Sequence, residues 1–301
     1  MTHRERTSTP DEQGRARVGA HTLHYSVAGD TGDGRRPLVL VNGLGANVGM
    51  WTPFRTALGA RPTIAFDAPG TGGSSTPVRP LSMRELARVA LDLLDVLGAG
   101  DVDLLGYSFG GAVAQEMARA EPARFHRMVL AASTCGWGAL PGDPFALLAL
   151  LTPARYYFGP ATSATTAFFG DGSPRDFAVA DTARLRNPPD PVGYAWQLVA
   201  ALGWSSLAWL HRISVPTLVL GAQRDRMVHP STASLLARRI PGARLEVVPR
   251  AGHFFLLREH NEDVAHRVVR FLDEDQAMPD SAGRGSVASG ATSSPAALAC
   301  T

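Results

Sequence analysis

Lysine is absent from this 301-residue sequence, so all 29 of its Lys and Arg residues are arginine. The absence excludes a phosphate-binding loop of the GxxxxGK type, a Schiff-base lysine and a Ser–Lys catalytic pair. Arginine does not replace lysine in these roles, because its guanidinium stays charged. The arginines are scattered along the chain, and the formal net charge is only +2. Neither feature is typical of a protein that binds nucleic-acid phosphates.

Cysteine and long apolar runs are also scarce. The two cysteines, Cys135 and Cys300, are far apart in the sequence, whereas a disulfide framework needs more cysteines and a zinc site needs clustered ligands. The first residues, 1–17, are polar and lack the apolar segment of a signal peptide. No apolar run approaches the roughly 20 residues of a membrane-spanning helix. These absences predict a cytoplasmic protein without a structural metal.

The sequence does contain a regular alternation of apolar runs and helical patterns, beginning near Gly19. Strands are predicted at residues 21–28, 37–41, 62–66, 102–105, 128–132, 217–220 and 245–248. Ser82 and Glu85 form the capping box of a predicted helix that ends near Gly98. Another helix is predicted over residues 110–120. Strands that alternate with helices indicate an α/β fold, with a mostly parallel sheet flanked by helices.

The same alternation divides the chain into segments. Residues 19–133 and 212–276 carry the predicted strands and form two parts of one core. Residues 134–211 are rich in Ala, Leu, Pro and aromatics and show helical patches but no obvious strand, which predicts a helical cap inserted into the core. Residues 1–18 are predicted to be disordered. The Gly/Ser/Ala-rich tail, residues 277–301, is predicted to be disordered as well, because such a composition cannot bury a core.

A GxSxG motif with Ser108 at its centre lies between a predicted strand and a predicted helix. This is the context of a nucleophile elbow, where glycines leave room for a strained turn that lifts the serine hydroxyl from the sheet. The motif alone is a weak signal in a chain with 31 glycines, and the alternative is a turn with an N-cap serine. The flanking strand and helix favour a catalytic nucleophile.

The segment VNGLGAN, residues 41–47, directly follows another buried strand. Its glycines allow backbone N–H groups to turn toward a ligand, as an oxyanion hole requires. We assign the two donors to the backbones of Leu44 and Phe109. A plain strand-ending turn is the alternative interpretation of this composition.

Asp225 is the candidate acid, because it comes just after the predicted strand 217–220. The position after strand 128–132, where an acid is also possible, holds Ser133 and Thr134 instead. A surface carboxylate that caps the next helix is the alternative role for Asp225.

His253 is the candidate general base, because it follows the last predicted strand in the segment AGHFF. His229 stands too close to Asp225 for a separate loop to present it, and His260 lies among charged residues. The resulting chain order, Ser–Asp–His, is that of a nucleophile-elbow hydrolase. In such a triad His253 takes the serine proton while Asp225 fixes the histidine tautomer, so that no metal or organic cofactor is needed.

With these residues in place, the chain resembles the α/β-hydrolase superfamily over about residues 19–272, including the loop FDAPGTGGSS at 66–75. More narrowly, it is similar to intracellular poly(3-hydroxyalkanoate) depolymerases of the medium-chain-length type. The similar segments are VNGLGAN at 41–47, GGSSTP at 72–77, YAWQL at 194–198 and GWSSLAWL at 203–210. The elbow departs from that family, with Tyr107 and Phe109 where a smaller residue and tryptophan are expected.

The resemblance implies hydrolysis of a storage polyester of 3-hydroxy acids at the surface of an intracellular granule. Two alternatives stay open: a generic carboxylesterase or perhydrolase acting on small esters, and a non-catalytic binding protein with the hydrolase fold. Dehalogenases and epoxide hydrolases require an aspartate nucleophile, so Ser108 excludes both.

Aromatic residues are concentrated in the predicted cap, at Tyr156, Tyr157, Phe158, Phe168, Phe169, Tyr194, Trp196, Trp204 and Trp209. Aromatics at helical spacing often serve packing alone. A cap over the elbow must nevertheless line the entrance to Ser108, and apolar side chains line most sites for apolar ligands. We therefore expect Tyr194, Trp196, Trp204 and Trp209 to bind substrate.

Overall fold

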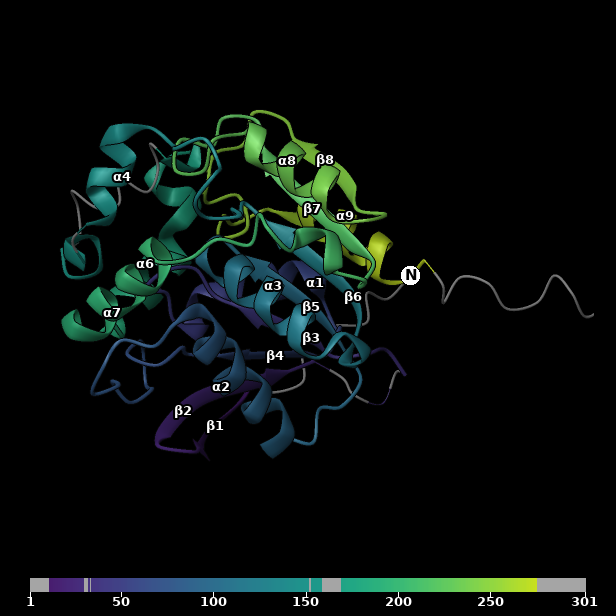
Figure 1. Ribbon diagram of the computed structural model, residues 1–301. Coiled ribbons are helices and arrows are strands. Elements are labelled where there is room, and N and C mark those ends of the chain that lie inside the picture. Colours follow the sequence, from purple (N-terminus) through teal and green to yellow (C-terminus); the bar gives the residue numbers. More distant parts are fainter. Residues whose placement is uncertain (1–10, 30–31, 33, 152, 159–168, 275–301) are drawn as a thin grey trace, which may run out of the picture.

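The computed structural model describes residues 11–29, 32, 34–151, 153–158 and 169–274 of the chain (Figure 1). The predicted tail at 277–301 and the cap aromatic Phe168 lie outside these described residues. In the described part, no helix is long and apolar enough to cross a membrane.

An eight-stranded sheet forms the centre of the fold (Figure 1), in the order β1-β2-β4-β3-β5-β6-β7-β8. Its strands are β1 Glu12–Val18, β2 His21–Ala28, β3 Leu38–Val41, β4 Thr63–Phe66, β5 Val102–Tyr107, β6 Phe125–Ala131, β7 Thr217–Ala222 and β8 Arg244–Val248. From β4 to β8 all neighbouring strands are parallel, whereas β2 pairs antiparallel with both β1 and β4 and is the one strand of this sheet that runs in the opposite direction. The predicted α/β architecture is therefore confirmed.

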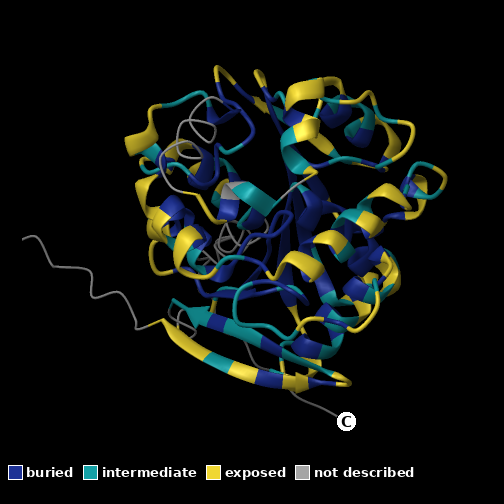
Figure 2. Ribbon diagram, turned by 90° about the vertical axis from the view of Figure 1, so that its left-hand side faces the viewer, coloured by how far each residue is buried: buried dark blue, intermediate teal, exposed yellow. Residues whose placement is uncertain are grey.

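The central strands are largely apolar because both faces of the sheet are covered, and the one carboxylate in β5, Asp103, is paired with Arg61. Every residue of β3, β4 and β5 is buried, as expected for parallel strands with helices on them. Figure 2 shows this buried centre in dark blue, with the more exposed β1 and β2 at one edge. The flanking helices are α1 Thr52–Leu58, α2 Met83–Val96, α3 Phe109–Ala120, α8 Ser231–Arg239 and α9 Glu262–Leu272. Helix α2 packs against α3, and α1 packs against α9.

Helix α2 begins where its capping box predicts. The Ser82 hydroxyl accepts a hydrogen bond from the Glu85 backbone N–H, and the Glu85 carboxylate accepts one from the Ser82 N–H. These two bonds satisfy backbone donors that have no partner inside the helix.

Strand β1 corrects the predicted disorder of segment 1–18 for residues 12–18, while residues 1–10 lie outside the described residues. Residues 12–18 pair with β2 over its length, from Glu12 opposite Val27 to Val18 opposite His21. The strand lies at the edge of the sheet, so only Ala16 and Val18 are buried and the other side chains remain polar. Its composition therefore matches that of a disordered segment.

Residues 134–211, which we call the cap, lie between β6 and β7. The described cap residues form α4 Pro144–Leu150, α6 Ala178–Arg186, α7 Pro191–Leu202 and the short 3-10 helices η4 Pro153–Tyr156, η5 Pro174–Phe177 and η6 Leu210–Arg212. Only isolated bridges, such as Gly136 with Ser205, pair extended residues within the described cap. Helices α4, α6 and α7 lie together beside the sheet, on one side of the molecule (Figure 1). Two further 3-10 helices, η2 Val48–Trp51 and η3 Pro122–Arg124, belong to the core.

Candidate active site

Ser108 stands at the sharp turn between β5 and α3. Its backbone has φ 54° and ψ −120°, a conformation that side-chain-bearing residues rarely adopt. The turn is held by a hydrogen bond from the Ser108 N–H to the Ala131 carbonyl, 2.9 Å long. The surrounding structure thus maintains the strained turn expected of a nucleophile elbow.

The two glycines of the GxSxG motif are needed for space. A Cβ on Gly110 would lie 2.1 Å from the Val41 carbonyl oxygen, and one on Gly106 would lie 2.6 Å from the Ala114 Cβ. Both distances are far below van der Waals contact, so a side chain at either position would push α3 away from the sheet. The glycines therefore set how closely the elbow approaches strand β3.

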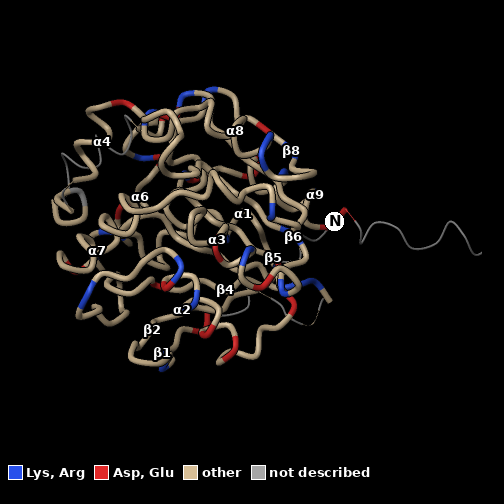
Figure 3. Tube along the Cα trace, viewed as in Figure 1, with Lys and Arg blue, Asp and Glu red and all other residues tan. Residues whose placement is uncertain are grey.

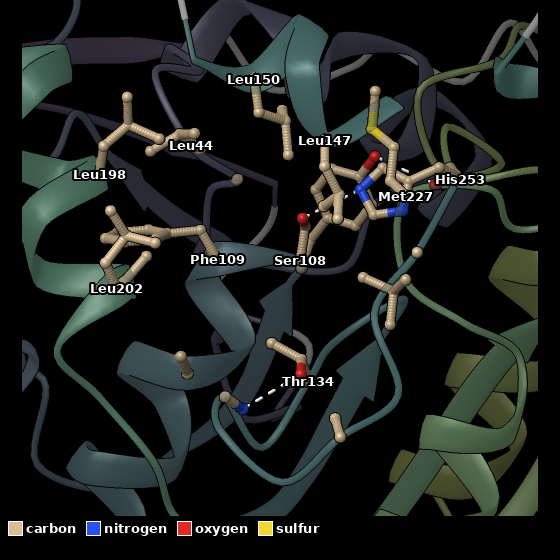
Figure 4. Close-up of a pocket in the computed structure, with 18 of the residues that line it drawn as sticks. Leu44, Ser108, Phe109, Thr134, Leu147, Leu150, Leu198, Leu202, Met227 and His253 are labelled. Carbon is tan, nitrogen blue, oxygen red and sulfur yellow. Dashed lines mark hydrogen bonds between the residues drawn. The ribbon is translucent and has the colours of Figure 1, made fainter. Parts of the chain in front are cut away.

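Ser108, His253 and Asp225 form one chain of hydrogen bonds. The Ser108 Oγ lies 2.9 Å from His253 Nε2 (Figure 4), and His253 Nδ1 lies 2.8 Å from Asp225 Oδ2. The side chains come from three different loops at the carboxyl ends of β5, β7 and β8. His253 and Asp225 are buried, with 3% and 6% of their surfaces exposed. Water is thereby kept from the histidine–carboxylate pair.

Further contacts fix the acid and the base. The Asp225 Oδ1 accepts hydrogen bonds from the backbone N–H groups of Met227 and Val228, at 2.9 and 2.8 Å. The Tyr107 hydroxyl donates to the His253 carbonyl at 3.1 Å, from the residue directly before Ser108. The carboxylate therefore faces the histidine, and Tyr107 joins the elbow to the histidine loop.

The rival residues lie elsewhere. His229 is exposed and its Nδ1 is 2.8 Å from the Ser231 hydroxyl, while the His260 side chain is 90% exposed. Ser133 donates its hydroxyl to the Ser108 carbonyl. In the described part of the chain, no three His, Cys, Asp or Glu side chains are grouped so as to hold a metal ion.

The predicted oxyanion residues, Leu44 and Phe109, both line the cavity that contains Ser108. Phe109 is the first residue of α3, where a backbone N–H has no acceptor within its own helix. Leu44 lies in the loop after β3, between Gly43 and Gly45, and Gly45 has a positive φ of 69°. The two segments approach Ser108 from neighbouring strands of the sheet.

Cap residues hold the loop that carries Leu44. The Gln197 Oε1 of α7 accepts a hydrogen bond from the Gly45 N–H at 2.9 Å. The Tyr156 hydroxyl donates to the Leu44 carbonyl. Tyr194 packs so closely on Gly45 that an added Cβ there would lie 2.7 Å from its ring. The cap thus acts on the candidate oxyanion hole through main-chain contacts, which the sequence did not predict.

A cavity of about 510 Å³ opens over Ser108 and is mostly apolar. Its wall includes Leu147 and Leu150 of α4, Leu198 and Leu202 of α7, and Met227 next to the histidine (Figure 4). Only aromatic residues of the cap were predicted from the sequence to bind substrate. The leucines were missed, although their spacing in α4 and α7 is that of helix faces.

Of the four cap residues expected to bind substrate, only Trp204 lies on the cavity wall. Tyr194 is buried against Gly45, and its hydroxyl donates to the Leu150 carbonyl. Trp196 donates to the Pro77 carbonyl, and Trp209 packs edge-on against Trp204. The prediction is thus corrected for three of the four residues, because their rings fill the space between cap and core.

A family model described as "Alpha/beta hydrolase family" matches residues 38–267. The chain therefore belongs to the alpha/beta hydrolase family, and it is a hydrolase of the serine esterase class. Among curated proteins, it is 39% identical over 244 residues to a poly(3-hydroxyalkanoate) depolymerase of Ectopseudomonas oleovorans, covering 80% of this chain and 85% of that protein. This likeness confirms the resemblance noted in the sequence.

Solved structures agree on the fold. The enol-lactonase of Burkholderia xenovorans LB400 superposes with a TM-score of 0.74 at 26% identity, covering 86% of this chain and 99% of that one. A thermophilic esterase of Thermogutta terrifontis gives a TM-score of 0.70 at 24% identity, with coverage of 87% and 98%.

Proposed function

We propose that this chain hydrolyses a polyester of 3-hydroxy acids, with Ser108 as nucleophile, His253 as general base and Asp225 as the acid that orients the base. One observation carries the proposal: the Ser108–His253–Asp225 chain of hydrogen bonds lies in a mostly apolar cavity of about 510 Å³.

The reaction follows from the positions of these groups. His253 Nε2 takes the Ser108 proton as the Oγ attacks the ester carbonyl, and the backbone N–H groups of Leu44 and Phe109 stabilise the resulting oxyanion. The C–O bond of the ester then breaks, and the protonated histidine gives its proton to the leaving alkoxide. Water, activated by the same histidine, releases the acyl group from Ser108.

The substrate class is supported by the cavity and by the relative. A mostly apolar wall favours an acyl chain with several methylenes, since each buried methylene contributes about 0.8 kcal/mol. The protein 39% identical to this chain is a poly(3-hydroxyalkanoate) depolymerase. The relative supports a polyester of 3-hydroxy acids, and the apolar cavity favours side chains of medium length over a small polar ester.

Docking on a polyester granule, in the cytoplasm, is part of the same proposal. Leu140, Leu151 and Leu202 line the cavity and are also 59%, 62% and 61% exposed, which places them at its opening. Phe145 and Leu148 of α4 extend this exposed apolar surface. Helices α4 and α7 contain no charged residue, whereas acidic and basic residues occur over much of the remaining chain (Figure 3). Such a surface suits contact with a condensed apolar substrate.

The test is release of 3-hydroxy acids or their oligomers from amorphous medium-chain polyester granules, alongside p-nitrophenyl esters from acetate to octanoate. We expect soluble products from the granules and a kcat/KM that rises with acyl length. Ester hydrolysis that peaks at acetate, without granule hydrolysis, would leave the generic carboxylesterase or perhydrolase. No turnover of any ester would favour the non-catalytic binding protein.

A further inference from the structure

Most polar side chains that line the cavity already form hydrogen bonds with other groups of the protein. The Trp137 and Trp204 indoles donate to the Leu202 carbonyl and to Glu116, and the Tyr107 and Tyr156 hydroxyls donate to backbone carbonyls. Apart from Ser108 and His253, this leaves one polar side chain among the described lining residues, Thr134.

Thr134 is held close to the elbow. Ser133, directly before it, donates its hydroxyl to the Ser108 carbonyl at 3.1 Å. The Thr134 carbonyl accepts a hydrogen bond from Gln115 Nε2 at 3.0 Å, and the Gln115 Oε1 accepts one from the Ser206 hydroxyl at 2.6 Å. Gln115 and Ser206 are both fully buried. The main chain at Thr134 is therefore fixed by the same α3 helix that carries the elbow.

The Thr134 hydroxyl has unused capacity to donate. Its oxygen accepts a hydrogen bond from the Gly136 N–H at 3.1 Å (Figure 4). No acceptor for the hydroxyl proton is found among the residues that the structure describes. A hydroxyl donates one hydrogen bond and accepts two, so the Thr134 hydroxyl can still donate one to a ligand in the mostly apolar cavity that Thr134 lines.

We propose that Thr134 determines specificity by donating a hydrogen bond to an oxygen on carbon 3 of the substrate acyl unit. This inference rests on the function proposed above. It adds recognition of the oxygen on carbon 3, which a 3-hydroxyacyl ester carries and a plain fatty acyl ester lacks. The apolar wall binds the alkyl chain of both esters alike, whereas the Thr134 hydroxyl gains an acceptor only from the first. A net hydrogen bond of this kind changes relative binding by up to about tenfold.

The experiment compares Thr134→Val and Thr134→Ser with the unmodified protein on p-nitrophenyl octanoate and p-nitrophenyl 3-hydroxyoctanoate. The measured quantity is the ratio of kcat/KM for the hydroxy ester to that for the plain ester. We expect Thr134→Val to lower this ratio about tenfold, and Thr134→Ser, which retains the hydroxyl, to preserve it. Because valine nearly matches threonine in shape, loss of packing would affect both esters alike and leave the ratio unchanged.

An unchanged ratio in Thr134→Val, or an equal fall in Thr134→Ser, would overturn the inference. Thr134→Ala provides a second hydroxyl-free variant if the valine variant is unstable, and it should lower the ratio as well. Hydrolysis of neither ester by the unmodified protein would instead contradict the proposed function itself.

Discussion

The indole nitrogen of Trp204 donates a hydrogen bond to the buried Glu116 Oε1, across 3.0 Å. Glu116 lies in α3, two turns after the elbow, and its Oε2 accepts hydrogen bonds from Arg119. The Trp204 ring also packs edge-on against Trp209, with ring centroids 6.3 Å apart. These contacts fix the orientation of Trp204. Of the four cap residues that were expected to bind substrate, Trp204 is the one that lines the cavity.

Trp204→Ala should flatten the dependence of activity on acyl length. Without the indole, the cavity offers less apolar contact to a long chain, so kcat/KM for octanoate should fall about tenfold more than for acetate. Trp196→Ala is the matched control, because Trp196 lies outside the cavity wall and bonds to the Pro77 carbonyl. If kcat/KM rises equally steeply with acyl length in the Trp204 variant and in the unmodified protein, Trp204 does not contribute to binding of the acyl chain.

Ser108→Ala should abolish ester hydrolysis while the fold is retained. Loss of a triad nucleophile lowers kcat by about 10⁶ in other serine hydrolases. A serine-directed phosphonate, followed by mass spectrometry, should label Ser108 in the unmodified protein and nothing in the variant. Labelling at Ser74 or Ser133 would contradict the assignment of the nucleophile.

Asp225→Asn should lower kcat by about 10⁴, because an amide in place of the carboxylate favours the wrong tautomer of His253. The amide oxygen can still accept from the Met227 and Val228 N–H groups, so the loop should remain in place. Circular dichroism checks the fold, and single-turnover kinetics measure the chemical step. Activity within tenfold of the unmodified protein would mean that another group orients His253.

Gln197→Leu should slow the reaction by about tenfold at every acyl length. The substitution removes the acceptor for the Gly45 N–H and frees the loop that carries Leu44, a smaller loss than removal of an oxyanion donor. Val199→Ala, on the exposed face of the same helix, is the control. A change confined to long-chain esters would instead indicate a role in binding the acyl chain.

Ser82→Ala should destabilise the protein by about 1 kcal/mol through loss of the α2 cap, with unchanged ester kinetics.

The pKa of the Glu85 carboxyl is lowered from 4.5 to about 2, first by its bond to Arg79 and then by its bonds to Ser82. The stabilisation by Glu85 is therefore present above pH 4.5 and lost as the pH falls toward 2. The Arg79 bond is present in both proteins, so only the bond from the Ser82 hydroxyl to Glu85 makes their difference in stability depend on pH. In urea titrations that part of the difference should be lost over this range, and a difference that does not narrow at all would contradict this account.

Much of the core was predictable because its elements are defined by local patterns. Strand β3 is an uninterrupted apolar run, and β4 and β5 are largely apolar apart from Thr63 and Asp103. The chain order Ser108, Asp225, His253 led to three residues that meet in space. Parallel strands end at one edge of the sheet, so loops far apart in the sequence converge there.

The edge strand and the cap were less predictable. Strand β1 buries only Ala16 and Val18, so pairing with β2 rather than its own pattern makes it a strand. In the cap, the sequence does not distinguish Trp204, on the cavity wall, from Trp209, which packs behind it. That difference depends on tertiary packing, which a list of aromatic positions does not contain.

The bond between Gln197 and the Gly45 N–H has a consequence for exchanging parts between related hydrolases. A cap transplanted to alter substrate preference would also replace the partners of the Leu44–Gly45 loop, and with them the support of a candidate oxyanion donor. The loop after β3 and helix α7 therefore form a single unit for grafting, although about 150 residues separate them in the chain. Chimeras that move both segments together should retain turnover better than chimeras that move the cap alone.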